Sequence, residues 1–131
     1  TLFLAILDLN KGVLRYVSAA HPQPMALLPN AGWTAACPSD SARLGTDDAV
    51  FHERNLKLKD MKGLLLFTPG VLQTRSAQGE ELGAIGMMRA VKGAAPDSAQ
   101  GIVAAVAEAV ESFRRSLAQM HDLTLLALSV R

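Results

Sequence analysis

The first two-thirds of the chain alternate short apolar runs with turn residues, a pattern typical of β-strands. Residues 1–9 are almost entirely apolar, so we expect a strand that is buried on both faces. Asn-Lys-Gly at 10–12 predicts a tight turn, and residues 13–18 then form the second strand of a hairpin. Two further apolar runs, at 25–28 and 64–67, predict strands, and the second run predicts a central, buried one.

The region between these two runs carries weaker signals. Pro-Asn-Ala-Gly at 29–32 predicts a turn, and a short extended segment follows from Trp33. Residues 38–49 are rich in Ser, Asp and Gly and predict a loop. Residues 50–58 alternate without separating a clean apolar face, which favours an edge strand with limited burial.

The last third of the chain carries a helical pattern and then a final strand. Residues 98–117 predict the longest helix, with Asp97 and Gln100 as a capping-box variant at its start. Five apolar residues recur there at steps of three and four: Ile102, Val106, Val110, Phe113 and Leu117. A shorter helix is expected over 84–91 and a final strand over 123–130. This order of elements predicts an α+β fold, a β-sandwich flanked by helices, in one domain.

Composition excludes several classes of function. Thirteen Lys and Arg against twelve Asp and Glu leave no basic field, so we expect no nucleic-acid partner. The single cysteine, Cys37, cannot form a disulfide within the chain, which favours a cytoplasmic location, and we interpret it as a small apolar loop residue. No apolar run approaches the roughly 20 residues that span a bilayer, so we expect no membrane insertion. An opening within an apolar strand, without Met, favours a piece of a longer protein.

Three short segments are candidates for chemistry, although each alone has an ordinary structural interpretation. Residues 18–22 place a lone histidine, His21, beside prolines at a strand end. Residues 67–71 end a buried strand with a Pro-Gly turn. Residues 121–124 place a His-Asp pair before the last strand, where a solvated loop is the simpler interpretation.

Taken together, in their order and spacing, these segments resemble the sporulation-phosphatase (SpoIIE-like) branch of the PPM family of metal-dependent serine/threonine phosphatases. Residues 18–22 read Ser-Ala-Ala-His-Pro where the family has Asn-Ala-Gly-His-Pro. Residues 68–71 read Thr-Pro-Gly-Val where the family has Thr-Asp-Gly-Val, and residues 77–83 resemble the glycine- and glutamate-containing stretch that follows it. Residues 121–125 read His-Asp-Leu-Thr-Leu where the family has Asp-Asp-Xaa-Thr-Leu. The resemblance covers 1–131 as the C-terminal two-thirds of one such domain, without its N-terminal part.

The departures from the family pattern fall on its metal ligands. The resemblance implies that Pro69 and His121 stand where active members have metal-binding Asp residues, while Asp122 is retained. The 131 residues contain nothing like the family's Gly-Asp-Xaa-Xaa-Gly-His-Gly segment, which supplies another ligand. Ala20 replaces a family glycine. We therefore expect Pro69, His121 and Asp122 to converge at one end of the sandwich, with a rim formed by His21, Thr68 and Gly70.

The function that follows from the resemblance is a catalytically degenerate phosphatase domain that acts as a binding or regulatory module. No metal is expected to bind the chain as given, whereas active family members use Mn²⁺ or Mg²⁺. The expected partner is a protein resembling an anti-anti-sigma factor, in bacterial partner switching, and a homodimer is possible. Two alternatives stay open: an active phosphoserine or phosphothreonine phosphatase when the full-length domain is present, and a scaffold or dimerisation piece of a larger protein.

Overall fold

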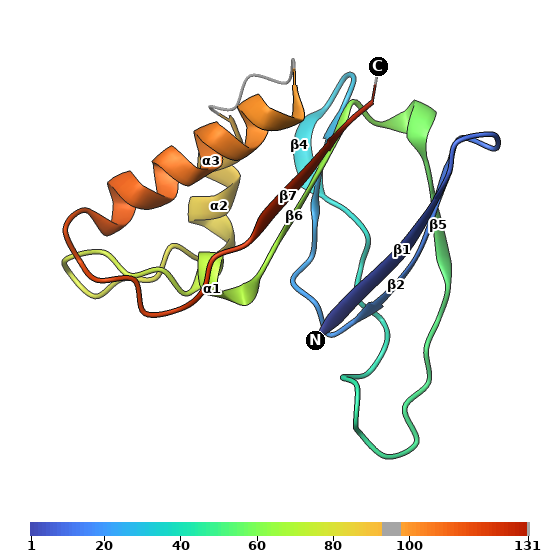
Figure 1. Ribbon diagram of the computed structural model, residues 1–131, viewed down its shortest axis with the longest axis horizontal. Coiled ribbons are helices and arrows are strands. Elements are labelled where there is room, and N and C mark those ends of the chain that lie inside the picture. The colour runs from blue at the N-terminus through green and yellow to red at the C-terminus, as the bar shows by residue number, and fades with distance from the viewer. Residues whose placement is uncertain (93–97, 131) are drawn as a thin grey trace.

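The computed structural model describes residues 1–92 and 98–130, and it places two antiparallel β-sheets face to face (Figure 1). One sheet has three strands in the order β1-β2-β5, and the other has four in the order β4-β3-β6-β7. The strands are β1 (Leu2–Asp8), β2 (Val13–Ala19), β3 (Met25–Leu28), β4 (Gly32–Ala35), β5 (Arg54–Lys57), β6 (Gly63–Phe67) and β7 (Leu125–Ser129). The helices are α1 (Pro69–Leu72), α2 (Gly83–Lys92), α3 (Ala99–Arg114) and the short 3₁₀ turn η1 (Leu58–Asp60).

Strand β6 is the central element of the fold, as its Leu-rich run predicts. It pairs with β3 on one side and β7 on the other. Its side chains alternate between two apolar clusters: Leu64 faces the three-stranded sheet, and Leu65 faces the helices. Both leucines are fully buried. The prediction of a central, buried strand is confirmed.

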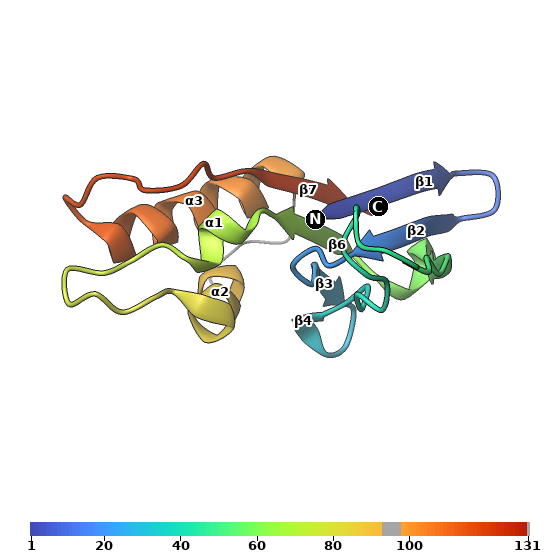
Figure 2. The ribbon, with the colours of Figure 1, turned by 90° about the horizontal axis from the view of Figure 1, so that it is seen from below.

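Helix α3 covers the four-stranded sheet with the face that the 3.6-residue period predicts. Ile102, Val106 and Val110 are at most 2% exposed, and Phe113 packs partly buried against the same cluster. Leu117, the fifth residue of the predicted face, follows the end of the helix and is exposed. Helix α2 lies in the same layer beside α3 (Figures 1 and 2). The helices therefore lie on one face of the sandwich, and the α+β class is confirmed.

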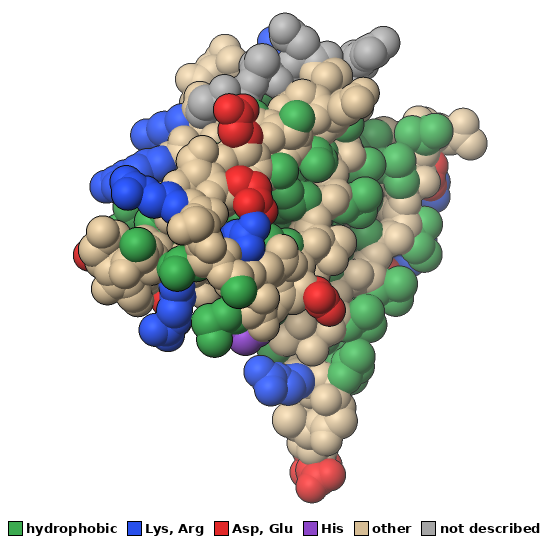
Figure 3. Space-filling view, turned by 60° about the vertical axis from the view of Figure 1, so that its left-hand side comes forward, with side chains coloured by type: hydrophobic (Ala, Val, Ile, Leu, Met, Phe, Trp, Pro, Cys, Tyr) green, Lys and Arg blue, Asp and Glu red, His purple; other side chains and the backbone are tan. Residues whose placement is uncertain are grey.

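The expectation that the first strand is buried on both faces is wrong. Strand β1 forms the edge of its sheet, and Leu4 and Ile6 on its outer face are each 58% exposed. On its inner face Phe3 stacks on Tyr16 with ring centroids 5.4 Å apart. The helices of the described chain cover the other sheet, so one face of β1 stays open. Figure 3 shows the resulting band of apolar side chains on the side where β1 and β7 form sheet edges.

Several predicted element boundaries also differ from the structure. The final strand, predicted over 123–130, is observed as Leu125–Ser129, because only these five residues pair with β6. Helix α3 ends at Arg114 instead of 117, because Arg115 turns to φ 57° while its N–H still bonds to the carbonyl of Glu111. Strand β5 covers Arg54–Lys57 instead of 50–58, because only these four residues pair with β2.

The start of helix α3 also differs from the prediction. Its N-cap is Ser98, whose hydroxyl accepts a hydrogen bond from the N–H of Gly101, whereas the predicted cap, Asp97, lies outside the described residues. The helix predicted over 84–91 is observed as α2, with one more residue at each end.

No helix in the described ranges is long and apolar enough to cross a membrane.

Candidate functional site

The segments containing Pro69 and Asp122 lie side by side at the end of the sandwich where β6 runs into α1. Thr68 forms the link between them. Its N–H donates to the carbonyl of Thr124 at 3.1 Å, and its hydroxyl oxygen accepts from the N–H of Thr124 at 3.0 Å. The same hydroxyl lies 3.4 Å from the carbonyl oxygen of Asp122, to which it donates a long hydrogen bond. One threonine therefore joins the end of β6 to the start of β7.

Gly70 permits the close approach of these two segments. A Cβ atom at this position would clash with the carbonyl oxygen of Asp122 and would lie 3.0 Å from Cβ of His121. Only a glycine lets the first turn of α1 pack so closely on this backbone. Gly70, His121 and Asp122 are thus in contact.

The side chains at this point do not form a cage for a hard divalent cation. Pro69 is the first residue of α1 and carries no donor atom. His121 offers an imidazole nitrogen, and Asp122 offers the single carboxylate of the three positions. Within residues 1–92 and 98–130, no three His, Cys, Asp or Glu side chains are grouped so that they could hold a metal ion. Mg²⁺ and Mn²⁺ favour several anionic oxygen ligands, so the donor set does not fit the family's metals.

His21, expected at the rim of the site, contacts Pro22 and Phe3. Its Nδ1 is 2.8 Å from the carbonyl oxygen of Pro22, and its ring centroid lies 5.7 Å from that of Phe3. The ring contact places His21 beside the start of β1. The neighbouring Ala20 has φ 52°, a left-handed conformation that favours glycine, and its N–H bonds to the carbonyl of Ser41 at 3.3 Å.

The loop after β4 extends past the same end of the molecule (Figure 1). Its base is held by the ion pair between Arg54 and Asp40 at 2.5 Å and by the N–H of His52, which donates to the hydroxyl of Ser41. The hydrogen bond from Arg54 lowers the pKa of the Asp40 carboxyl. The loop tip stays exposed.

Cys37 is buried, as its interpretation as an apolar loop residue predicts. Burial raises the pKa of its thiol to about 11, and burial likewise raises the pKa of the neighbouring Tyr16 to about 12. A thiol of this kind stays protonated near neutral pH and is a poor nucleophile.

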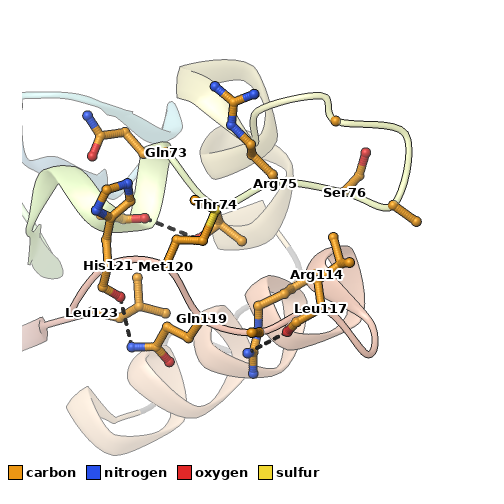
Figure 4. A pocket seen from close by; sticks show the side chains of 14 residues that line it. Gln73, Thr74, Arg75, Ser76, Arg114, Leu117, Gln119, Met120, His121 and Leu123 are labelled. Atoms are coloured by element: carbon orange, nitrogen blue, oxygen red, sulfur yellow. Dashed lines mark hydrogen bonds between the residues drawn. The ribbon is translucent and has the colours of Figure 1, made fainter.

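A cavity of about 420 Å³ lies beside Gly70 and His121, and sequence reasoning missed most of the residues that line it. Its walls are the loop after α1 and the loop between α3 and β7, which contribute Gln73, Arg75 and Arg114 among others (Figure 4). These loops are about forty residues apart in the sequence, so no local pattern indicates that they meet. The departure from the family motif at Pro69 indicates the region of the candidate site. It does not indicate that a cavity lies there.

Comparison with known proteins places the whole chain in one family. Residues 1–131 match the family model described as Stage II sporulation protein E (SpoIIE). A search of curated proteins finds no significant match.

Solved structures share the fold of the chain. The phosphatase domain of the cell fate determinant SpoIIE from Bacillus subtilis, from a Mn-presoaked crystal, superposes with a TM-score of 0.70 at 19% identity, over 99% of this chain and 56% of that one. The RsbU and RsbW domains of Rv1364c from Mycobacterium tuberculosis give 0.69 at 25% identity, over 97% of this chain and 35% of that one. The chain thus spans about half the length of the first structure. With its full-length family match and its sandwich of two antiparallel sheets, this chain belongs to the SpoIIE family of PP2C-type phosphatase domains.

Proposed function

We propose that this chain is a catalytically degenerate phosphatase domain that acts as a binding or regulatory module in bacterial signalling. The observation that carries the proposal is the donor set at the end of β6. Pro69 has no side-chain donor, and the neighbouring His121 is a nitrogen ligand where active relatives are expected to carry an acid. A single carboxylate, on Asp122, lies on this backbone.

The chemistry of phosphate-ester hydrolysis explains why these substitutions matter. Two divalent cations held a few ångströms apart activate a water and stabilise the developing charge on the phosphoryl group. Each cation needs several anionic oxygens in near-octahedral geometry. A proline at one ligand position removes an oxygen that no rotamer change can replace. The backbone around Gly70 nevertheless keeps the close packing of a formed site, which suits a surface kept for binding.

A second candidate function is an active, Mn²⁺- or Mg²⁺-dependent phosphoserine or phosphothreonine phosphatase. It is favoured by Asp122, which is exposed and lies directly against the first turn of α1. Activity of this kind requires further carboxylates from outside these 131 residues, acting with Asp122 and His121. The two candidates differ at position 69, where an acid would favour the enzyme.

The partner that the family membership suggests is a protein resembling an anti-anti-sigma factor, bound without being dephosphorylated. The near-balance of 13 basic and 12 acidic residues favours a protein partner over nucleic acid. A cytoplasmic location and a homodimer remain predictions of the same proposal.

A hydrolysis assay tests the proposal. The chain should release no nitrophenol from p-nitrophenyl phosphate and no phosphate from a phosphoserine peptide, even with millimolar Mn²⁺. The Asp122→Ala variant is the control, and it should match the parent chain. Mn²⁺-dependent turnover by this chain that is lost in Asp122→Ala would refute the proposal. The same Asp122-dependent turnover by the full-length protein would establish the second candidate.

A further inference from the structure

The cavity beside Gly70 has walls that are already ordered by hydrogen bonds. On one side the N–H of Leu82 donates to the carbonyl of Thr74, and the hydroxyl of Thr74 donates to the carbonyl of Gly70 at 3.1 Å. On the other side Arg114 donates to the carbonyl of Leu117, and the amide of Gln119 donates to the carbonyl of His121 (Figure 4). The cavity is therefore preformed, as ligand sites usually are.

The lining combines an apolar surface with positive charge. Leu117, Met120 and Leu123 supply apolar atoms, and among the described residues the lining contains two arginines, Arg75 and Arg114, and no acid. Glu81, which pairs with Arg75, is not in the lining of this cavity or of the adjoining one. Glu111, which pairs with Arg114, lines the adjoining second cavity, so Arg75 supplies the positive charge that faces a ligand. Figure 3, which brings this side of the molecule forward, shows basic and apolar side chains close together there.

Arg75 can exchange its partner at little cost. Its ion pair with Glu81 spans 2.8 Å, but both side chains are about half exposed, and such surface pairs contribute little stability. An incoming carboxylate can thus bind the same guanidinium while an adjoining apolar group enters the cavity. The charge complementarity indicates an acidic ligand with an apolar body.

The apolar surface continues beyond the cavity, which favours a peptide over a small free acid. Met120 is 76% exposed and Leu117 is 40% exposed at its margin. A second cavity of about 330 Å³ lies against α3 and the start of β7, and the two share Gln119 and Leu123 in their linings. A free acid would fill one cavity and leave this margin uncovered, whereas an extended peptide covers both.

We propose that these two joined cavities bind an acidic peptide segment of a protein partner, with an apolar side chain in the first cavity and a neighbouring carboxylate on Arg75. This inference rests on the proposed function, because it names the binding surface of the module. It places partner binding beside the degenerate metal positions and on the helical side of the sandwich.

Backbone amide shifts of the ¹⁵N-labelled chain test the proposal. The probe is a pool of tetrapeptides Asp-X-X-Asp, where X is Leu, Ile, Val or Phe, compared with matched Lys-X-X-Lys and Asp-Ser-Ser-Asp pools. The acidic apolar pool should shift amides in 73–79 and 114–123, and the other pools should bind at least several-fold more weakly. Shifts elsewhere, no shifts, or equal binding of the Lys pool would overturn the proposal. A free acid, 3-phenylpropionate, that binds as tightly as the pool would overturn the choice of a peptide.

Two variants locate the contact. Arg75→Gln should weaken binding of the acidic pool about three- to fivefold, the effect of one partly exposed ion pair. Arg89→Gln, on an exposed position of α2 outside the lining, is the matched control and should bind like the parent chain. Equal binding by all three chains would show that Arg75 does not contact the ligand. These binding measurements do not depend on turnover. A positive hydrolysis assay would therefore refute the proposed loss of catalysis, while the amide shifts would still test the binding surface separately.

Discussion

At the scale of single residues, Gly70 retains a glycine of the family pattern, whereas Ala20 replaces one. Gly70 meets the steric requirement of its position, because any side chain there would clash with the backbone of Asp122. Ala20 does not, since it occupies a left-handed conformation at φ 52° that costs an L-residue about 1–2 kcal/mol. The chain therefore carries local strain beside His21 where the family pattern has a glycine.

The strain at Ala20 predicts that Ala20→Gly stabilises the protein. Relief of the left-handed conformation exceeds the extra chain entropy of glycine, so the free energy of unfolding should rise by about 0.5–1 kcal/mol. Ala104→Gly, an exposed position inside α3, is the control and should lower it by about 1 kcal/mol. Urea denaturation of the three chains measures both values. A loss of stability in Ala20→Gly would mean that Ala20 is unstrained.

At the scale of elements, the sequence predicts the features that depend on local periodicity, such as which face of a helix is buried. The step of three and four at Ile102, Val106 and Val110 indicates the buried face of α3, because a helix repeats its surface at this spacing. The end of α3 was not predictable, since Arg114 and Arg115 continue the helical composition and no glycine or proline follows at once. Burial of β1 was not predictable either, because apolar residues do not reveal what covers them.

The loop between β4 and β5 should loosen in acid. Bonding to Arg54 lowers the pKa of Asp40, so the ion pair stabilises the loop base at neutral pH and this contribution is lost as pH falls below about 4. Heteronuclear NOE values for residues 42–53 should fall between pH 6 and pH 3 while those of β6 hold. In Asp40→Asn they should already be low at pH 6. A loop of equal rigidity in both chains at both pH values would contradict this assignment.

At the scale of the whole molecule, helices α2 and α3 of the described residues cover the four-stranded sheet, and the candidate site lies at the end of the sandwich. The resemblance of three short motifs was enough to predict the family and the class of fold, because each motif marks an end of a strand. The cavity formed by Arg75 and Arg114 was beyond prediction, since it depends on the meeting of two loops. The exposure of Leu4 and Ile6 on the outer face of β1 was not predictable either, because it depends on which elements cover that sheet.

Mn²⁺ binding measured by calorimetry tests the central claim most directly, because the claim concerns ligands before it concerns turnover. The account predicts no Mn²⁺ binding tighter than the millimolar range by this chain, and the same result for Asp122→Ala, since one carboxylate with imidazoles cannot replace several carboxylates. Pro69→Asp combined with His121→Asp should bind Mn²⁺ tightly only when the family's Gly-Asp segment is also present. Micromolar Mn²⁺ binding by the unaltered chain that disappears in Asp122→Ala would contradict the account.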